Sequence, residues 1–376
     1  MGIGLSSLLK HMKSKLRSCL AWGFSIFLGL ASIEVACELA YRLYKGKWYF
    51  RERQTSVRGM VQPHPYFGAC LVPNISEERN GIRMTHNSFR CRGPEFDRPK
   101  PRGRIRIATL GGSTTYCAGV SDDETWQYFL GEQLGTNYEV INMGAPGGTS
   151  LETMIQTALL FSDVQPDIAV YYLGWNDARV QHVKDLWPDW SDSHGKWVMS
   201  HGLGGRELQE RTAAGYLLKR MVFHYFFPRM DTDKALLDLK GSSDAFTDHI
   251  DMRAIGHYER NLRNIVALCR KQGVEPIFIP QFLNYRLLTS DKPYGWLPFV
   301  RDRDLEKVIH AYNASMAKVA KEEGVVFGGE VLEPRYGESD FIDNGHLSRS
   351  GNKLLANAMM RVISHSHVSN GRKAAP

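Results

Sequence analysis

The chain has 376 residues, of which 43% are hydrophobic and 23% are charged. This is long and apolar enough for a globular domain with additional segments, and it excludes a disordered chain. The net charge of +7 lies entirely in residues 1–60, which hold ten Lys or Arg against three acidic residues, so the other 316 residues are neutral overall. A basic groove for nucleic acid is therefore not expected.

The N-terminal segment contains an uncharged run over residues 19–33, CLAWGFSIFLGLASI, that continues as EVACELAYRLY. A bilayer-spanning helix needs about 20 apolar residues, and the run reaches that length if Glu34 and Glu38 lie near the membrane interface. We predict a single transmembrane anchor with basic flanks over residues 1–45. A cleaved signal peptide is disfavoured, because the charged leader is long and no small-residue cleavage site follows. A buried amphipathic helix is the remaining alternative.

Six cysteines show neither a C-x-x-C pair nor zinc-site spacing. Cys70 and Cys91 flank a loop-like segment and can form a disulfide if the domain is exported, but free thiols fit the sequence equally well. The redox compartment stays open.

Residues 46–103 are rich in Pro and Gly, which predicts a connector that packs irregularly on a larger body. From residue 104 short apolar runs alternate with helical patterns. The expected strands are 104–110, 138–144, 167–174, 275–282 and 325–329, and the expected helices are 123–134, 150–162, 253–271, 302–323 and 348–364. Continuous apolar strands separated by helices predict a three-layer α/β/α domain with a flavodoxin-like parallel sheet over residues 104–366. Residues 367–376 are expected to be a disordered tail.

An aromatic-rich insertion over about residues 178–250 interrupts this alternation. We expect a helical subdomain with a buried aromatic face, or alternatively a lid or acceptor-binding wall beside the site. The histidines scattered through the insertion are interpreted as surface or packing residues, and Trp126 is expected in the core.

Ser113 follows the first expected strand in the stretch IATLGGSTTYCAG. Small residues permit a sharp turn, after which a serine can project from a helix start whose free N–H groups favour negative charge. On its own such a turn is more typical of structure than of catalysis. It also differs from the nucleophile elbow G-x-S-x-G, because residue 115 is Thr115.

Two further loops follow the next two strands and can supply oxyanion donors. Gly147, in INMGAPGGTS, can offer a backbone N–H, with Gly144 as the competing glycine of the same loop. Asn176, in LGWNDAR, can offer a side-chain amide. Preorganised donors of this kind stabilise the oxyanion of an acyl-transfer transition state.

A fourth loop, FIDNGHLSRSGN, places Asp343 three residues before His346. This spacing lets the carboxylate hold the imidazole in one tautomer and stabilise the imidazolium. A nucleophile, a base, its acid and oxyanion donors complete the set that serine acyl chemistry requires.

The four blocks LGGSTT, NMGAPGGTS, LGWND and DNGH resemble, in this order, those of the SGNH (GDSL-like) hydrolases. The resemblance spans residues 104–363 and implies the SGNH hydrolase fold. It also implies Ser113 as nucleophile, His346 as general base and Asp343 as its partner. The oxyanion hole would comprise the N–H of Ser113, Gly147 and Asn176. One departure is Gly112, which stands where the family has aspartate.

Two other chemistries are weaker readings of the same residues. Cys117 with His346 suggests a thiol nucleophile, but Cys117 is expected inside the helix rather than at its start. Asp177, Asp343 and His346 suggest a metal site, but no metal-binding motif supports it. Neither a metal nor another cofactor is expected.

The sequence thus predicts a membrane-anchored serine esterase that acts on a small-molecule, glycan or lipid ester. One alternative is an O-acyltransferase that acetylates an exported carbohydrate, and another is a non-catalytic glycan- or lipid-binding protein on the same fold. Relatives with one N-terminal anchor imply a periplasmic or extracellular catalytic domain, although basic residues on both sides of the anchor leave its orientation open. Neither the acyl chain, the alcohol nor the oligomeric state follows from the sequence.

Overall fold

The computed structural model describes most of the chain, and every structural statement below concerns this part. The described residues are 3–46, 48–50, 60–79, 81–183, 186–190, 212–226, 248–291, 297 and 299–366. The expected C-terminal tail, residues 367–376, lies outside them, as do residues 191–211 and 227–247 of the expected insertion.

The chain forms two compact units. Unit 1 comprises Met1–Ser56 and Arg206–Pro228, and unit 2 comprises Val57–Gly205 and Arg229–Pro376. The sequence predicts segments that are each continuous along the chain, whereas each of these units consists of two separate stretches. Part of the insertion belongs with the N-terminal helix.

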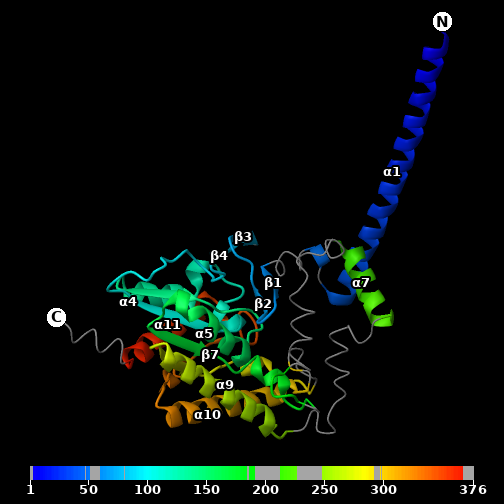
Figure 1. Cartoon of the computed structure of the whole chain (residues 1–376). Coiled ribbons are helices and arrows are strands. Elements are labelled where there is room, and N and C mark those ends of the chain that lie inside the picture. Colours follow the sequence, from blue (N-terminus) through cyan, green and yellow to red (C-terminus); the bar gives the residue numbers. More distant parts are fainter. Residues whose placement is uncertain are drawn as a thin grey trace. The chain divides into compact units, whose positions relative to one another are not determined.

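Unit 2 contains a sheet of five parallel strands in the order β6-β5-β7-β8-β9 (Figure 1). Its strands are β5 (Ile105–Gly111), β6 (Tyr138–Asn142), β7 (Ile168–Tyr172), β8 (Glu275–Ile279) and β9 (Val326–Phe327). This is the flavodoxin-like order 2-1-3-4-5, so the predicted sheet is confirmed. In such sheets ligands bind at the carboxyl ends of the strands, where the strand order reverses. Here that point lies between β5 and β7, the strands that precede Ser113 and Asn176.

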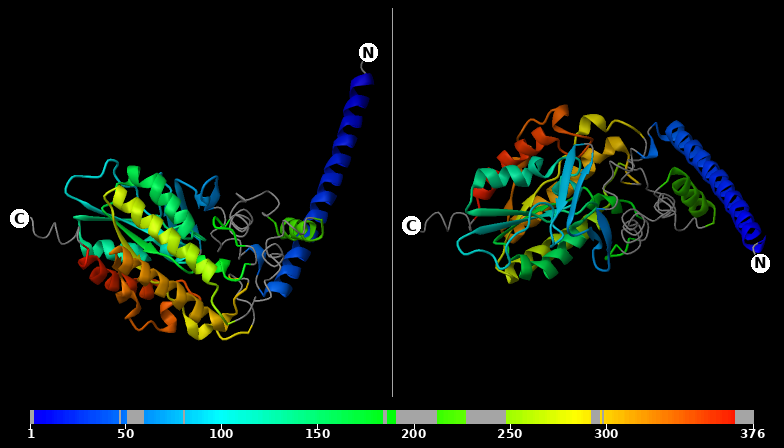
Figure 2. Two further views of the ribbon diagram at one scale, coloured as in Figure 1. Left: turned by 60° about the horizontal axis from the view of Figure 1, so that its bottom comes forward. Right: turned by 90° about the horizontal axis from the view of Figure 1, so that it is seen from above.

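Helices cover both faces of the sheet (Figure 2). Alternate strand residues enter two separate cores, because side chains alternate across a strand. Leu110 and Tyr171 pack with helices α5, α9 and α10 on one face, whereas Ile107 and Val170 pack with α4 and α11 on the other. The bounds are α4 Trp126–Leu134, α5 Ser150–Val164, α9 Met252–Lys271, α10 Leu305–Glu323 and α11 Arg349–Ser364.

Short helical turns occupy the loops at the strand ends. They are α3 (Ser113–Tyr116), η1 (Asp122–Glu124), η2 (Asp177–Val180), η4 (Tyr285–Leu287), η5 (Asp302–Asp304), η6 (Gly329–Leu332) and η7 (Glu338–Asp340). Of these, α3 begins with Ser113, and Asn176 directly precedes η2.

The connector is more regular than its Pro and Gly content predicts. It forms two antiparallel pairs, β1 (Val61–His64) with β2 (Gly68–Leu71) and β3 (Ile75–Arg79) with β4 (Ile82–His86). Pairing in hairpins satisfies backbone groups locally, which composition alone did not reveal. A backbone bridge from Arg92 to Asn142 joins the connector to the end of β6. Cys70 and Cys91 are buried free thiols.

Unit 1 consists of the long helix α1 (Ile3–Lys45), helix α7 (Ala213–Phe226) and a short segment after α1. Within α1, the stretch Lys15–Tyr44 contains a window of 18 residues with a mean hydropathy of 1.7, and it is long and apolar enough to cross a membrane. A signal sequence passes the same test of length and composition.

Candidate active site

The turn that carries Ser113 is shaped by two glycines with different roles. Gly111 ends β5 at φ +150°, and a Cβ there would lie 2.3 Å from the Tyr172 carbonyl oxygen. Gly111 thus lets the chain turn closely against β7. Ser113 then begins α3, and no described residue accepts a hydrogen bond from its backbone N–H. The nucleophile candidate is partly exposed and lies at the start of a helix.

Gly112 leaves room for the Asn176 side chain. A Cβ at residue 112 would lie 2.1 Å from Asn176 Nδ2 and 3.1 Å from the Gly148 carbonyl oxygen. Asn176 Nδ2 donates to that same oxygen over 2.8 Å. In this chain the Asn176 amide thus occupies space that a side chain at residue 112 would need.

His346 joins the two other members of the expected triad. Its Nε2 lies 2.8 Å from Ser113 Oγ, and its Nδ1 lies 2.8 Å from Asp343 Oδ2. Asp343 Oδ1 also accepts from the backbone N–H groups of His346 and Gly345 over 2.7 and 2.8 Å. Residues separated by 233 positions in sequence are thus brought into one hydrogen-bonded row.

The surroundings keep Asp343 ionised and the imidazole in place. Burial acts to raise the pKa of Asp343, but hydrogen bonds from His346 and Gly345 and the charge of His346 outweigh it and lower the pKa to about 2. Trp175 packs against the His346 ring with centroids 5.4 Å apart. A Cβ at Gly345 would lie 2.2 Å from the Trp175 ring, so this glycine permits the contact.

The two competing glycines of the second loop differ in what their N–H groups do. The Gly144 N–H donates to Asn142 Oδ1 over 3.0 Å. The Gly147 N–H donates to no described residue, and Gly147 lies at φ +83°. Gly147 is therefore the residue of this loop with an N–H available to a ligand.

Arg179 connects the two loops that hold the expected oxyanion donors. Its Nη2 donates to the Gly147 carbonyl over 2.8 Å, and its Nε donates to the Asn176 carbonyl over 3.2 Å. Arg179 is 5% exposed, and burial lowers its pKa to about 10, still far above neutral. A charged guanidinium thus fixes both backbones at the strand ends.

The sequence matches the model of the GDSL-like lipase/acylhydrolase family over residues 109–354. The chain belongs to this family. Its members are hydrolases that act on ester bonds, and the match includes every residue of the expected triad and oxyanion hole. A search of curated proteins finds no match.

Several solved structures are similar to this chain. One is TesA, with 14% identity, a TM-score of 0.40 and coverage of 69% of this chain and 98% of that one. A second is a GDSL-like lipase from Bacteroides thetaiotaomicron, with 13% identity, a TM-score of 0.41 and coverage of 72% of this chain and 92% of that one. A third is the aryl esterase of M. smegmatis, with 15% identity, a TM-score of 0.41 and coverage of 69% of this chain and 98% of that one.

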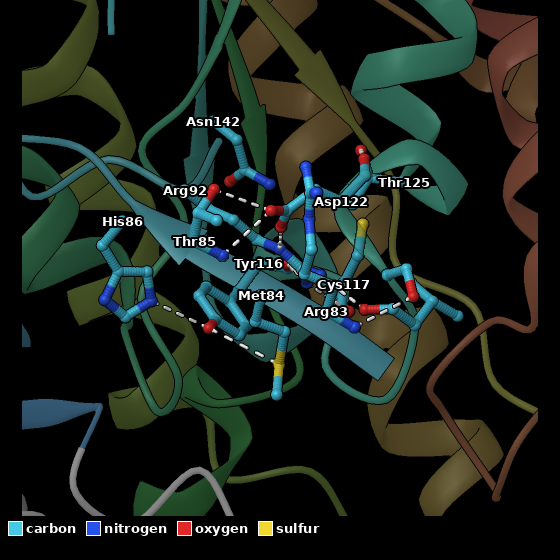
Figure 3. Close-up of polar contacts among 12 residues, drawn as sticks. Arg83, Met84, Thr85, His86, Arg92, Tyr116, Cys117, Asp122, Thr125 and Asn142 are labelled. Carbon is cyan, nitrogen blue, oxygen red and sulfur yellow. Dashed lines mark hydrogen bonds and ion pairs between the residues drawn. The ribbon is translucent and has the colours of Figure 1, made fainter. Parts of the chain in front are cut away.

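In this GDSL-like chain, Arg92 of the connector braces the end of the Ser113 helix (Figure 3). Its Nη1 donates to the carbonyls of Tyr116 and Cys117 over 2.6 Å each, and its Nη2 donates to that of Val120. Its Nε pairs with Asp122 Oδ1 at 2.9 Å. A single buried guanidinium therefore satisfies three backbone carbonyls within seven residues of the nucleophile candidate.

The connector strand β4 completes this brace (Figure 3). Thr85 donates its N–H and its hydroxyl to Asp122 Oδ2 over 2.9 and 2.7 Å. His86 Nε2 lies 2.9 Å from the Tyr116 hydroxyl, and burial lowers the pKa of this histidine, which favours its neutral form. The connector thus supports the active-site turn rather than merely linking it to α1.

The weaker candidates lie outside the hydrogen-bonded row. Cys117 follows α3 at φ +61°, is 4% exposed, and has a pKa raised to about 12 by burial, which disfavours the thiolate. Asp177 accepts from the N–H groups of Ser150 and Gly174 instead of joining Asp343, and burial raises its pKa to about 6. The described residues contain no cluster able to hold a metal ion. Trp126 is fully buried, and His182 is buried beside His249.

Sequence reasoning missed Arg92, Trp175 and Arg179. All three are buried, at 4%, 6% and 5% exposure. Arg179 could have been suspected, because it follows the N-D pair by two residues on the same turn. Arg92 gave no comparable signal, since its partners lie 24 or more residues away.

Proposed function

We propose that this family member is a serine esterase that cleaves a carboxylic ester through an acyl-enzyme on Ser113. The observation that carries the proposal is the position of His346, with one ring nitrogen 2.8 Å from Ser113 Oγ and the other 2.8 Å from Asp343. This geometry lets the imidazole take the serine proton while the carboxylate fixes its tautomer.

The first half-reaction forms the acyl-enzyme. Ser113 Oγ attacks the ester carbonyl carbon as His346 Nε2 accepts the hydroxyl proton. The imidazolium is stabilised by Asp343, which its pKa of about 2 keeps ionised at neutral pH. His346 then returns the proton to the leaving alkoxide, so an alcohol departs. In the second half-reaction water attacks the acyl group, again with His346 as base, and the acid is released.

The oxyanion of each tetrahedral intermediate is held by the N–H of Ser113, the N–H of Gly147 and the Asn176 amide. The N–H groups of Ser113 and Gly147, which donate to no residue in the described part of the chain, support this assignment, and the engaged N–H of Gly144 disfavours the competing glycine. One donor of this kind contributes about 3 kcal/mol to transition-state stabilisation.

We further propose that α1 anchors the enzyme in a membrane, with the catalytic unit on the periplasmic or extracellular side. The apolar stretch Lys15–Tyr44 supports anchoring, because at about 1.5 Å per residue it is longer than the hydrocarbon core. Retention of the full chain in carbonate-washed membranes tests anchoring. Reporter fusions at the C-terminus test the orientation, and activity only of a cytoplasmic reporter would contradict it.

The enzymatic proposal is tested with short-chain p-nitrophenyl esters between about pH 6 and 9, where a histidine base is active. We expect hydrolysis by the wild type, none above background by Ser113→Ala, and fluorophosphonate labelling of the wild type only. Equal inactivity of both proteins together with no labelling would overturn the esterase and favour a binding protein. Product that shifts from free acid to acylated sugar when a carbohydrate is added would favour the O-acyltransferase.

A further inference from the structure

Helix α7 is bound to α1 by the carboxylate of Glu34, the first acidic residue after the uncharged run 19–33. Glu34 Oε1 accepts from the Ala213 N–H over 2.6 Å, and Glu34 Oε2 accepts from the Ala214 N–H over 3.0 Å. These N–H groups belong to the first turn of α7, where a helix has unpaired donors and a partial positive charge. The acid that interrupts the apolar run is thus the N-terminal cap of a second helix.

The next acid of the run has an equivalent role. Glu38, one turn after Glu34, accepts from the N–H groups of Tyr49 and Phe50 over 3.0 and 3.1 Å. An aromatic cluster joins the same three segments: Tyr41 of α1, Tyr49 of the segment after α1, and Tyr216 of α7 have ring centroids 4.8 to 5.7 Å apart. One stripe of α1 therefore receives both α7 and the segment that follows α1 (Figure 1).

The position of this junction along α1 sets its depth in a bilayer. From Arg17 to Glu34 the helix rises about 25 Å, at 1.5 Å per residue. The hydrocarbon core of a bilayer is about 30 Å thick, so with Arg17 at one headgroup layer Glu34 lies near the opposite boundary of the core. Trp48, which Arg42 contacts 4.4 Å from the ring centroid, and the tyrosine cluster provide the aromatic residues typical of that boundary.

Helix α7 has a second apolar stripe beside the one that contacts α1. Ala213, Tyr216 and Leu217 face α1. Leu218 and Met221 are 57% and 53% exposed within the described chain. The first turn of α7 lies at the level of Glu34, and Leu218 follows Ala213 by five residues and Met221 by eight.

We propose that α7 is an interfacial helix whose Leu218 and Met221 insert into the acyl–headgroup boundary of the same bilayer that α1 spans. The proposal rests on the proposed anchoring by α1. Residues 206–228 belong to unit 1, so the chain passes between the two units three times, after residues 56, 205 and 228. Three chain segments instead of one therefore tether unit 2 to the membrane-bound unit 1. Such a tether favours ester substrates that are themselves in or near the membrane.

The test uses the full chain with Cys19 and Cys37 replaced by serine, because the other four cysteines are buried. Leu218→Cys or Met221→Cys carries a thiol-reactive fluorophore, and the protein is reconstituted in vesicles of phosphatidylcholine and phosphatidylglycerol. Leu287→Cys, at a 56% exposed position of unit 2, is the aqueous control, and Leu28→Cys, at a 49% exposed position of α1, is the membrane control. Ester hydrolysis by each labelled protein shows that it is folded.

We expect labels at residues 218 and 221 to be quenched by lipids with a spin label near the headgroup, and to be quenched by iodide at least about threefold less than the label at 287. Iodide quenching equal to that at 287 would overturn the proposal. Protection from iodide without lipid quenching would also overturn it, since a protein surface would then cover the stripe.

Two further results separate the proposal from the anchor on which it rests. Lipid quenching at residue 28 but not at 218 and 221 leaves α1 as an anchor and contradicts the interfacial helix alone. No lipid quenching at residue 28 contradicts both. Glu34→Ala is expected to restore iodide quenching at 218 while leaving 28 protected, because it removes the cap that binds α7 to α1.

Discussion

The two loops that meet at the active site are stabilised in opposite ways. The Asp343–His346 loop is largely self-contained: Asp343 accepts from the side chain of His346 and from two backbone N–H groups within three residues of itself. The Ser113 turn depends on distant residues, above all Arg92 of the connector. The comparison teaches that a substitution in the first loop can change chemistry with little effect on the fold, whereas the second couples chemistry to folding.

Among the substitutions that test this comparison, Asp343→Asn is expected to have the largest effect on activity. The amide keeps the shape of the side chain but loses the charge that stabilises the imidazolium and fixes its tautomer, so kcat is expected to fall about 10⁴-fold. Because the carboxylate side chain is half-exposed, the midpoint of thermal unfolding should stay close to that of the wild type. Ester hydrolysis and circular dichroism on the same preparation measure both. Wild-type activity would contradict the role given to Asp343.

A smaller loss is expected from Gly112→Ala on the Ser113 side. The new Cβ would meet Asn176 Nδ2 and displace an oxyanion donor, which costs about 10²- to 10³-fold in kcat. Gly131→Ala is the matched control, since its Cβ would meet nothing closer than 3.9 Å, from Val140. Full activity of Gly112→Ala would show that Asn176 does not hold the oxyanion from its present position.

Arg92→Gln tests the brace itself. Removing the guanidinium takes the Arg92 donors from three buried carbonyls and from Asp122 Oδ1, which is expected to destabilise unit 2 by about 3 to 5 kcal/mol. The exposed Arg83 lies in the same connector, and Arg83→Gln should change stability by less than about 0.5 kcal/mol. Thermal unfolding in detergent compares the two. An equal midpoint for Arg92→Gln and the wild type would contradict the account.

The smallest expected effect concerns the dependence of kcat/KM on pH, which tests the Asp343–His346 loop. An ionised Asp343 holds the tautomer of His346, and its pKa of about 2 keeps this carboxylate ionised at and above mildly acidic pH. Protonation of Asp343 is therefore expected to add no acid step to the profile of kcat/KM near pH 4, the ordinary range of an aspartate. An acid step near pH 4 would show that the His346 hydrogen bonds do not hold in solution.

The difference between local and distant contacts also explains which features the sequence could predict. The parallel sheet followed from apolar strands alternating with helices, and the triad candidates followed from short sequence motifs. Gly147 over Gly144 was expected from its neighbours, and the backbone hydrogen bonds now support that choice. These features depend on local sequence, which explains why they could be read.

The supports of the nucleophile could not be read in this way. Arg92 acts on carbonyls 24 and more residues away, and a buried arginine has the same sequence signature as an exposed one. Gly112 stood out only as a departure from the family. Its steric reason, the Asn176 amide in the space of its Cβ, required the folded positions of both loops. The hairpins of the connector were missed because its Pro and Gly content indicated irregular chain.

The most direct test of the central claim is to locate the nucleophile covalently. The purified full chain is treated with a fluorophosphonate, and the modified peptide is identified by mass spectrometry while ester hydrolysis is followed in parallel. The account predicts one adduct on Ser113, with activity lost in proportion to labelling and no adduct on Ser113→Ala. An adduct on another residue, or ester hydrolysis that persists in Ser113→Ala, would contradict it.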